Sequence, residues 1–133
     1  MLLILFVEDR NKASWILGDK VRDFEMLPGQ DNLLLELDKL KVNFKKIDAL
    51  IMLVKDASLT QLKVFTTTLN TLAWSFDLPT LGKFYFNEDK EQIINKSSRE
   101  IAKIKKFKPI KVEYRRQAEI TLSKKQPKYK IAK

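Results

Sequence analysis

Apolar residues divide the chain into an alternating series of predicted strands and helices. Residues 1–7 and 48–54 are unbroken apolar runs, which are typical of central strands buried on both faces, and the second run favours a parallel strand. Apolar residues alternate on either side of a Gly18-Asp19 turn, which predicts a hairpin over residues 12–27. Residues 80–86 form a further predicted strand, and the chain therefore contains both a meander and parallel strands.

A short helix, a highly charged helix and a last strand are also predicted. Asp31 follows the Pro28-Gly29 break and is the predicted N-cap of a short helix over residues 32–41. In that helix Leu33, Leu37 and Leu40 share one face, while Leu34 and Leu35 point elsewhere. Residues 88–106 predict a highly charged helix, and alternation at Ile110, Val112 and Tyr114 predicts a final strand.

The segment from Ala57 to Pro79 is the best-defined helix of the sequence. Ser58 and Gln61 have the spacing of a capping box, and Pro79 ends the helix because its predecessor is pushed out of the α region. One face of this helix has the apolar pattern of a core: Leu62, Phe65, Leu69, Leu72, Ala73 and Phe76. The opposite face carries no charge, which predicts contact with another helix: Val64, Thr67, Thr68, Thr71, Trp74 and Ser75.

Three strands in a meander, followed by helix, strand, helix and strand, are the element order of the ribonuclease H-like fold, which actin-like and sugar-kinase ATPases share. We therefore predict an α/β protein with one ribonuclease H-like lobe over residues 1–86. Residues 87–133 form a basic helical and strand tail that packs on the lobe or extends from it. A length of 133 residues fits one domain. By analogy of fold alone, both nucleases and phosphotransferases stay open.

Composition narrows the chemistry. The chain has no cysteine and no histidine, which excludes disulfides, thiolate chemistry, histidine-dependent triads and the usual zinc sites. This suits a cytoplasmic protein, and the apolar start reads as a strand and not as a signal peptide or membrane span. Residues 1–89 contain 11 Lys/Arg and 13 Asp/Glu, whereas residues 90–133 contain 15 and 4. The basic character lies in the tail and indicates an anionic partner or a solvated surface.

The run from Ser58 to Val64, with Asn70 to Trp74 and Leu78-Pro79, resembles the Ser-Phe-Thr-Gly-Leu-Arg-Ile signature of the TsaB family, previously called YeaZ, and the residues that follow it. The strand from Ile47 to Ile51 and the helix start at Asn32 are similar to the family's preceding elements. Tyr114-Arg115-Arg116, Glu119-Ile120-Thr121 and Lys124-Lys125 resemble its C-terminal tail. The match covers residues 1 to about 85 and about 110 to 130, with only some 25 residues where the family has a second lobe, so the chain resembles a TsaB reduced to its first lobe and tail.

The residues that would bind phosphate and metal in this family are replaced here. The family's Asp-Thr after the first strand falls at Val7-Glu8, and glycines of its phosphate loop fall at Lys55, Ala57 and Gln61. Such glycines let backbone N–H groups approach phosphate, and an aspartate at position 7 would help to hold Mg²⁺. We therefore expect no catalytic residue, no metal, no cofactor and no appreciable ATP binding.

The resemblance implies a non-catalytic subunit of the complex that makes N6-threonylcarbamoyladenosine at position 37 of tRNA. In that family TsaB pairs with its relative TsaD through a helical bundle, and a TsaE ATPase and tRNA bind to the pair. The corresponding partner surface comprises Leu34, Leu35, Asp38, Val64, Thr67, Thr68, Thr71 and Trp74. The residues expected to contact tRNA are Lys103, Lys105, Lys106, Arg115, Arg116, Lys124 and Lys125.

Three alternatives stay open at this point. The uncharged helix face could form a homodimer or contact the chain's own tail. The protein could be a metal-dependent nuclease that uses Glu8, Asp9 and Asp56 at strand ends together with Glu36. It could also be a plain RNA-binding module that works through the basic tail, although Phe107, Tyr114 and Tyr129 are too widely spaced for a paired stacking platform.

Overall fold

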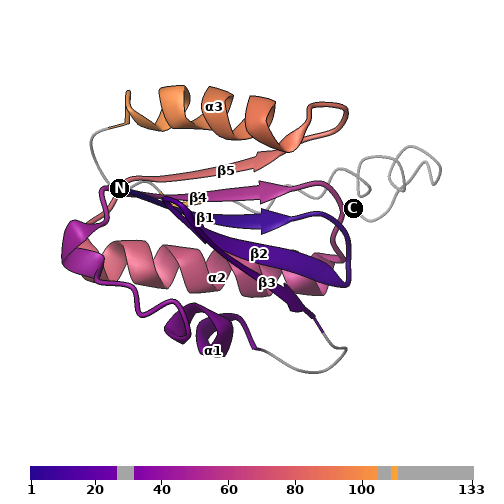
Figure 1. Ribbon diagram of the computed structural model, residues 1–133, viewed down its shortest axis with the longest axis horizontal. Helices are drawn as coiled ribbons and strands as arrows, with labels where there is room; N and C mark the ends of the chain where they lie inside the picture. Colours follow the sequence, from indigo (N-terminus) through magenta and orange to yellow (C-terminus); the bar gives the residue numbers. More distant parts are fainter. Residues whose placement is uncertain (27–31, 105–108, 111–133) are drawn as a thin grey trace, which may run out of the picture.

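A five-stranded mixed sheet forms the centre of the protein. The computed structural model describes residues 1–26, 32–104 and 109–110. The strands are β1 (Leu2–Val7), β2 (Lys12–Leu17), β3 (Lys20–Glu25), β4 (Ala49–Val54) and β5 (Thr80–Phe84), in the spatial order β3-β2-β1-β4-β5 (Figure 1). Strands β1, β4 and β5 are parallel, whereas β2 is antiparallel to both β1 and β3. This order and these directions are those of the ribonuclease H-like fold, as the sequence predicted.

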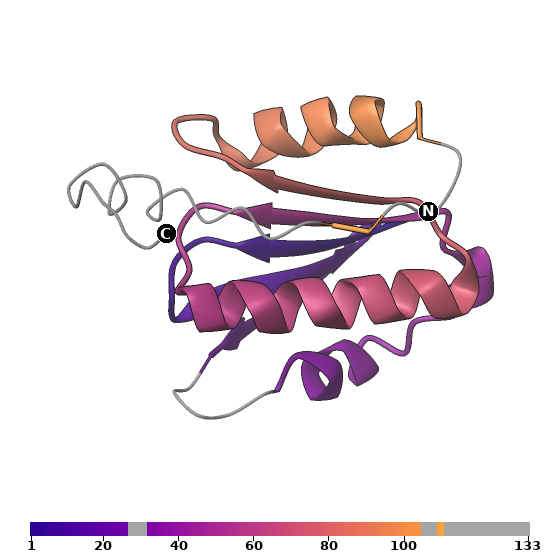
Figure 2. The ribbon, with the colours of Figure 1, turned by 180° about the vertical axis from the view of Figure 1, so that it is seen from behind.

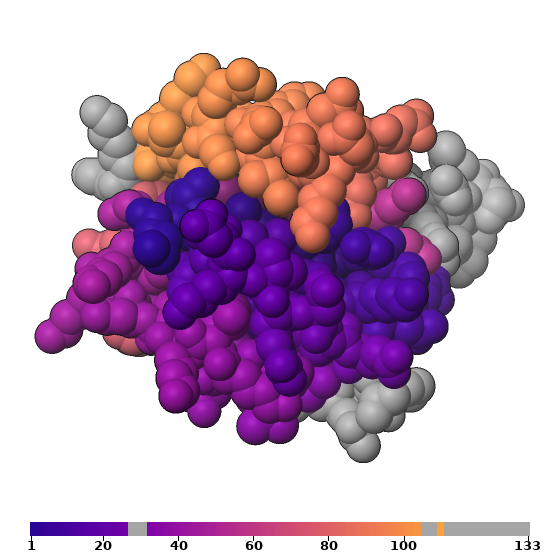
Figure 3. Space-filling model, in the orientation of Figure 1, coloured from indigo at the N-terminus to yellow at the C-terminus, as the bar shows by residue number. Residues whose placement is uncertain are grey.

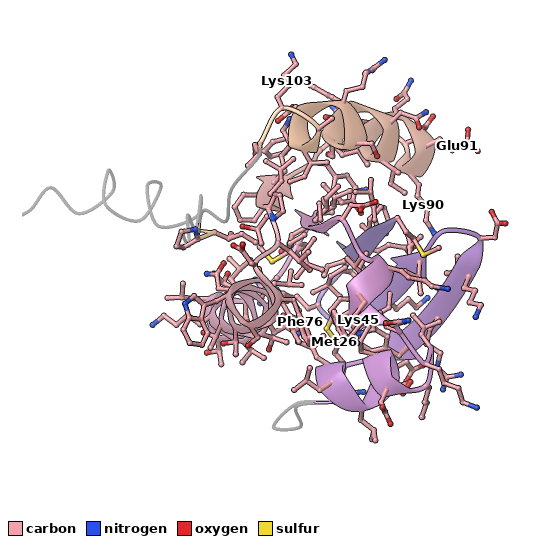
Figure 4. All side chains as sticks on the ribbon, turned by 90° about the vertical axis from the view of Figure 1, so that its left-hand side faces the viewer. Met26, Lys45, Phe76, Lys90, Glu91 and Lys103 are labelled. Atoms are coloured by element: carbon pink, nitrogen blue, oxygen red, sulfur yellow. The ribbon has the colours of Figure 1, made fainter. Side chains whose placement is uncertain are left out.

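Helices cover the two faces of the sheet. Helix α1 (Leu33–Asp38) and the long helix α2 (Leu59–Phe76) lie side by side on one face, and α3 (Lys90–Ile101) lies on the other (Figures 1 and 4). A short 3₁₀ turn, η1 (Phe44–Lys46), precedes β4. The result is a three-layer α/β/α arrangement, because the central strands are apolar on both sides and need a helix on each.

The alternation of side chains in β1 divides the core into two clusters. Leu3, Leu5 and Val7 pack with the helices α1 and α2, whereas Ile4 and Phe6 pack with α3. In β4 every residue is buried, which explains the unbroken apolar run of that strand. Tyr85 follows β5 and stacks on Phe6 on the α3 side, with 5.1 Å between the ring centroids.

The turn between β2 and β3 and the cap at the start of α2 are those that the sequence predicted. Gly18 has a φ of 59° in the turn between β2 and β3, where glycine adopts the left-handed region without a steric penalty. Ser58 and Gln61 form both hydrogen bonds of a capping box at the start of α2. Asp89 and Gln92 form a second capping box at the start of α3.

Helix α1 is shorter than the predicted helix over residues 32–41. It ends at Asp38 because the amide of Leu40 bonds to the carbonyl of Leu37 in a tight turn and Lys41 turns into the left-handed region with a φ of 54°. Its N-cap is Asn32, without a side-chain cap, while the predicted cap Asp31 lies outside the described residues. The predicted burial is nevertheless confirmed, because Leu33, Leu37 and Leu40 are buried and Leu34 and Leu35 are exposed.

Three further predictions of local structure need correction or lie outside the described part. Phe76, predicted in the core, is 46 % exposed because it lies in the last turn of α2. Its ring stacks on that of Phe44 in η1, with 4.6 Å between the ring centroids. Helix α3 ends at Ile101 and not at residue 106, and residues 105–106 are not described. Ile110 belongs to no strand, and Val112 and Tyr114 of the predicted last strand lie outside the described residues. No helix in the described ranges is both long and apolar enough to span a bilayer.

Candidate partner-binding surface

The outer face of α2 exposes apolar and small polar side chains to solvent. Trp74 is 73 % exposed, the largest exposed fraction among the large hydrophobic side chains described. Thr67, Thr71 and Ser75 are also exposed, and Val64 and Thr68 are partly buried. A tryptophan left in water forgoes a large gain from burial, so an exposed Trp amid uncharged neighbours is characteristic of a contact surface.

Both ends of α2 are held firmly in place. At the start, the Gln61 side chain completes the capping box and also donates from Nε2 to the carbonyl of Arg10 at 2.6 Å. At the end, Asp77 adopts the left-handed conformation and the amide of Leu78 donates to the carbonyl of Ala73. On the inner face, Leu62, Phe65 and Leu69 are almost fully buried against the sheet. The exposed face of α2 is therefore presented on a rigid element.

Helix α1 adds two exposed leucines beside α2. Leu34 is 54 % exposed and Leu35 is 62 % exposed. Glu36 of the same helix reaches Arg22 of the edge strand β3, with a guanidinium nitrogen 3.2 Å from its carboxylate. At 100° per residue, Leu34 and Asp38 lie about 160° from Glu36, on the side of α1 away from its contact with Arg22. The structure thus brings the residues predicted from the sequence onto the same face of the sheet: Leu34, Leu35 and Asp38 from α1 and Val64, Thr67, Thr68, Thr71 and Trp74 from α2. We call these residues the docking surface.

A shallow hollow marks one end of the docking surface. It has a volume of about 260 Å³ and is lined by Lys63, Val64, Thr67 and Thr68. Lys63 lies at the margin of the uncharged face and places one positive charge there. A hollow of this size between small side chains can receive a side chain of a partner helix.

Glu36 is the buried carboxylate on this side of the sheet. It lies 2.9 Å from the Lys39 ammonium and 3.2 Å from the Arg22 guanidinium. The hydrogen bond from Lys39, and then the contact with Arg22, hold the pKa of the Glu36 carboxyl below its usual value in spite of burial. Its charge is satisfied within the protein, so Glu36 supports α1 and is not presented to a ligand.

Three of the four acidic residues of the metal-nuclease alternative take part in other interactions. The carboxylate of Asp9 accepts hydrogen bonds from the amides of Asn11 and Lys12 and shapes the turn between β1 and β2. Asp56 forms an ion pair with Arg10 at 3.6 Å. Glu36 forms an ion pair with Arg22. Through the strand pairing, Arg22 lies opposite Trp15, which in turn lies opposite Leu5 in the middle of β1. Glu36 is therefore not level with Glu8, which follows the end of β1. Within the described ranges, no three acidic side chains are placed to hold a metal ion.

The positions that would hold phosphate in the resembled family are occupied by other interactions. Val7 ends β1 with its side chain fully buried. The amides of Ser58 and Gln61 at the start of α2, which could otherwise bind an anion, are bonded to each other's side chains. Ala57 is buried beside them and contributes a side chain where a phosphate loop needs glycine.

Only one residue of the predicted tRNA-binding set can be placed. Lys103 is exposed just beyond α3, on the face of the sheet opposite to α2 (Figure 4). The others lie outside the described residues: Lys105, Lys106, Arg115, Arg116, Lys124 and Lys125. Their role stays a prediction.

A second hollow is lined by residues of the strands β2 and β3 and by Glu8. Figure 3 shows the side of the molecule on which α3 covers only part of the sheet. The hollow has a volume of about 510 Å³, and its polar lining residues are Glu8, Lys12, Ser14, Asp23 and Glu25. The Ser14 hydroxyl donates to the Asp23 carboxylate within it. Our sequence reasoning missed this hollow, although the polar residues that alternate along both strands could have indicated a solvent-facing half-sheet.

Comparison with known proteins finds similarity among solved structures. The chain matches no protein-family profile and no curated protein. Among solved structures it is similar to YeaZ from Pseudomonas aeruginosa, with 17 % identity, a TM-score of 0.47, and coverage of 74 % of this chain and 48 % of that one. It is also similar to an uncharacterized protein described as having similarity to peptidase YEAZ from Pseudomonas aeruginosa, with 16 % identity, a TM-score of 0.47 and the same coverage. The chain thus spans about half the length of each.

Proposed function

We propose that this protein is a TsaB-like, non-catalytic subunit of a complex that modifies tRNA to N6-threonylcarbamoyladenosine. In this proposal the docking surface pairs with helices of a TsaD-like catalytic subunit. The ribonuclease H-like topology and the signature residues of α2 support the proposal. The observation that carries it is the uncharged outer face of α2 with Trp74 left 73 % exposed.

The shape of the docking surface suits a helical partner. Thr67, Thr71 and Ser75 follow one another along the exposed side of α2 at helical spacing, and their short side chains allow another helix to approach closely. Val64 and Trp74 add apolar area at either end of this row. Large aromatic anchors surrounded by small residues dominate the binding energy of many interfaces.

The end of β1 and the start of α2 support the non-catalytic role in this proposal. Val7 supplies no metal ligand, and the amides at the start of α2 are already bonded to side chains. Catalysis in such a complex would fall to the partner. The basic C-terminal residues would then meet tRNA phosphates, and a TsaE-like ATPase would bind to the assembled pair.

The proposal is tested by adding one positive charge to the docking surface. Thr71→Arg places a guanidinium where a partner helix would bury it unpaired, so the complex with a TsaD-like subunit should be lost on a sizing column. Asn95→Arg adds the same charge to an exposed position of α3, on the opposite face of the sheet, and should leave the complex intact. Both variants should melt within about 2 °C of the unmodified protein, because both sites are exposed.

Two outcomes would overturn the proposal. If the unmodified protein forms no complex with the TsaD-like subunit and instead forms a dimer that Thr71→Arg disrupts, the surface serves self-association. If Thr71→Arg leaves the partner complex intact, the docking surface is assigned wrongly.

A further inference from the structure

Ile110 is held on the lobe by the side chain of a residue forty positions earlier. The Asn70 Oδ1 atom accepts from the amide of Ile110 at 2.8 Å, and the Asn70 Nδ2 atom donates to the carbonyl of Ile110 at 3.0 Å. One side-chain amide therefore satisfies both backbone groups of a single residue. Paired strands satisfy an extended residue in the same way, and the Asn70 amide takes the place of the neighbouring strand.

Gly82 in β5 accommodates the side chain of Ile110. A Cβ atom built on Gly82 would lie 2.5 Å from the Ile110 Cγ2 atom, closer than carbon atoms can pack. Gly82 does not have a positive φ, so no turn requires glycine there. A glycine inside a strand is unfavourable unless another chain segment approaches closely, and Ile110 is that segment.

The remaining contacts of Ile110 are apolar. Its side chain is partly buried and packs against the core cluster that α2 shares with the sheet. Figure 2 shows residues 109–110 as a short orange segment on the α2 side of the sheet. Strand β5 is the last strand of the sheet, so Ile110 packs on the face of an edge strand.

We propose that Asn70 and Gly82 form a binding site for an extended peptide segment with an aliphatic side chain, and that the chain's own Pro109-Ile110 is its occupant. The Asn70 side chain forms hydrogen bonds with the backbone N–H and C=O groups of the occupant, and Gly82 leaves room for its branched side chain. Pro109 suits an extended occupant because its φ is fixed and it has no amide that needs a partner. We call Asn70 and Gly82 together the Ile110 seat.

The seat determines where the basic segment leaves the lobe. Residues 111–133 contain eight Lys/Arg and two Glu. Asn70 follows Thr67 by three positions and precedes Trp74 by four, so the seat borders the docking surface on the same helix. Occupation of the seat places Ile110, the residue before this basic segment, beside α2 and not beside α3.

The first test uses the full chain and two substitutions of the seat. Asn70→Asp keeps the size of the side chain but turns a donor into an acceptor that faces the Ile110 carbonyl. Gly82→Ala adds the Cβ atom that meets Ile110. We expect both variants to accelerate tryptic cleavage after Lys111 and hydrogen exchange of the Ile110 amide by about tenfold or more, because each must release Ile110.

Asn95→Asp makes the same amide-to-carboxylate change on the exposed face of α3 and is the matched control. It should change neither rate. Thermal melts of all three variants separate release of the segment from unfolding of the lobe. If Asn70→Asp and Gly82→Ala leave both rates unchanged while the lobe stays folded, the contact holds nothing and the proposal is wrong.

The second test asks whether the seat recognises a peptide in trans. Ile110→Asp in the full chain should vacate the seat, and a fluorescent peptide of residues 107–114 should then bind with saturable anisotropy. The unmodified protein should bind it at least tenfold more weakly, and so should the Ile110→Asp variant that also carries Gly82→Ala. Equal binding to all three proteins would show that the peptide binds elsewhere and overturn the proposal.

Protein concentration separates an occupant in cis from one in trans. Protection of Lys111 that is constant over a hundredfold dilution supports occupation by the same molecule. Protection that disappears on dilution would show that the segment comes from a second copy and would overturn the assignment in cis. These measurements involve no TsaD-like partner, so they succeed or fail independently of the proposed function.

Discussion

Helices α2 and α3 cover opposite faces of one sheet, and they differ mainly in what they present to solvent. Both begin with a capping box and bury apolar residues against the same strands. The exposed side of α3 carries charged residues, among them Glu91, Lys96 and Arg99. The exposed side of α2 carries Thr67, Thr71 and Trp74.

This difference separates the requirements of folding from those of function. Helix α3 shows that a helix packed on this sheet can carry charged residues on its solvent-exposed face, as expected for an amphipathic surface helix. Folding alone therefore does not require an uncharged face on α2. The proposed partner helix would favour such a face, since unpaired charges are costly to bury in an interface.

The largest effect should come from the inner faces, where the two helices are alike. Leu69 of α2 and Ile93 of α3 are both fully buried. Leu69→Ala and Ile93→Ala should each lower the free energy of unfolding by about 2–5 kcal/mol, because each leaves a cavity. Urea denaturation of both variants measures this loss.

Partner binding by the folded fraction should be unchanged in both cavity variants. If only one of the two substitutions destabilises the protein, one helix contributes far less to the fold than its packing indicates. The comparison between α2 and α3 would then lose its basis.

Much of the fold could be predicted because the strongest signals are local. The apolar run of β4, the Gly18 turn and the capping box at Ser58 each follow from nearby residues. The end of α1 could not be predicted, since the left-handed conformation at Lys41 has no signal in the residue type. The stacking of Phe76 on Phe44 could not be predicted either, because the two residues lie far apart in the sequence.

The site was predictable in composition but not in contacts. The uncharged face of α2 follows from helical spacing alone, and the structure leaves it exposed. The pairing of Glu36 with Arg22 depends on how α1 packs against β3, and the sequence suggested a metal-binding role for that carboxylate. The bond between Asn70 and Ile110 spans 40 positions, which no local pattern reveals.

A smaller effect should distinguish the outer faces. Trp74→Ala should weaken binding of a TsaD-like partner by about 2 kcal/mol, or roughly 30-fold in Kd, because exposed aromatic anchors dominate interfaces. Lys96→Ala removes an exposed side chain of α3 and should leave Kd within twofold. Calorimetric titration with each variant measures both values.

The two substitutions should have little effect on the free energy of unfolding, because both side chains are exposed. If Trp74→Ala destabilises the lobe by more than 1 kcal/mol, the tryptophan supports the fold and its exposure is not evidence of a partner.

The smallest expected effect concerns the buried carboxylate of Glu36 in α1. Glu36 is ionised and bonded to Lys39 and Arg22, and its pKa lies below the usual 4.5. A carboxyl whose pKa is lowered by folding stabilises the protein above its unfolded pKa, and this contribution disappears as the pH falls through the lower, folded value. Glu36→Gln should therefore reduce the free energy of unfolding by about 1 kcal/mol at pH 7, since the two cationic partners are half exposed and water screens them. Below pH 4.5 the difference between the variant and the unmodified protein should narrow as Glu36 becomes protonated. Urea denaturation at pH 7 and at pH 3 measures both limits, and a difference that stays the same at both would show that Glu36 stabilises α1 by packing and not by charge.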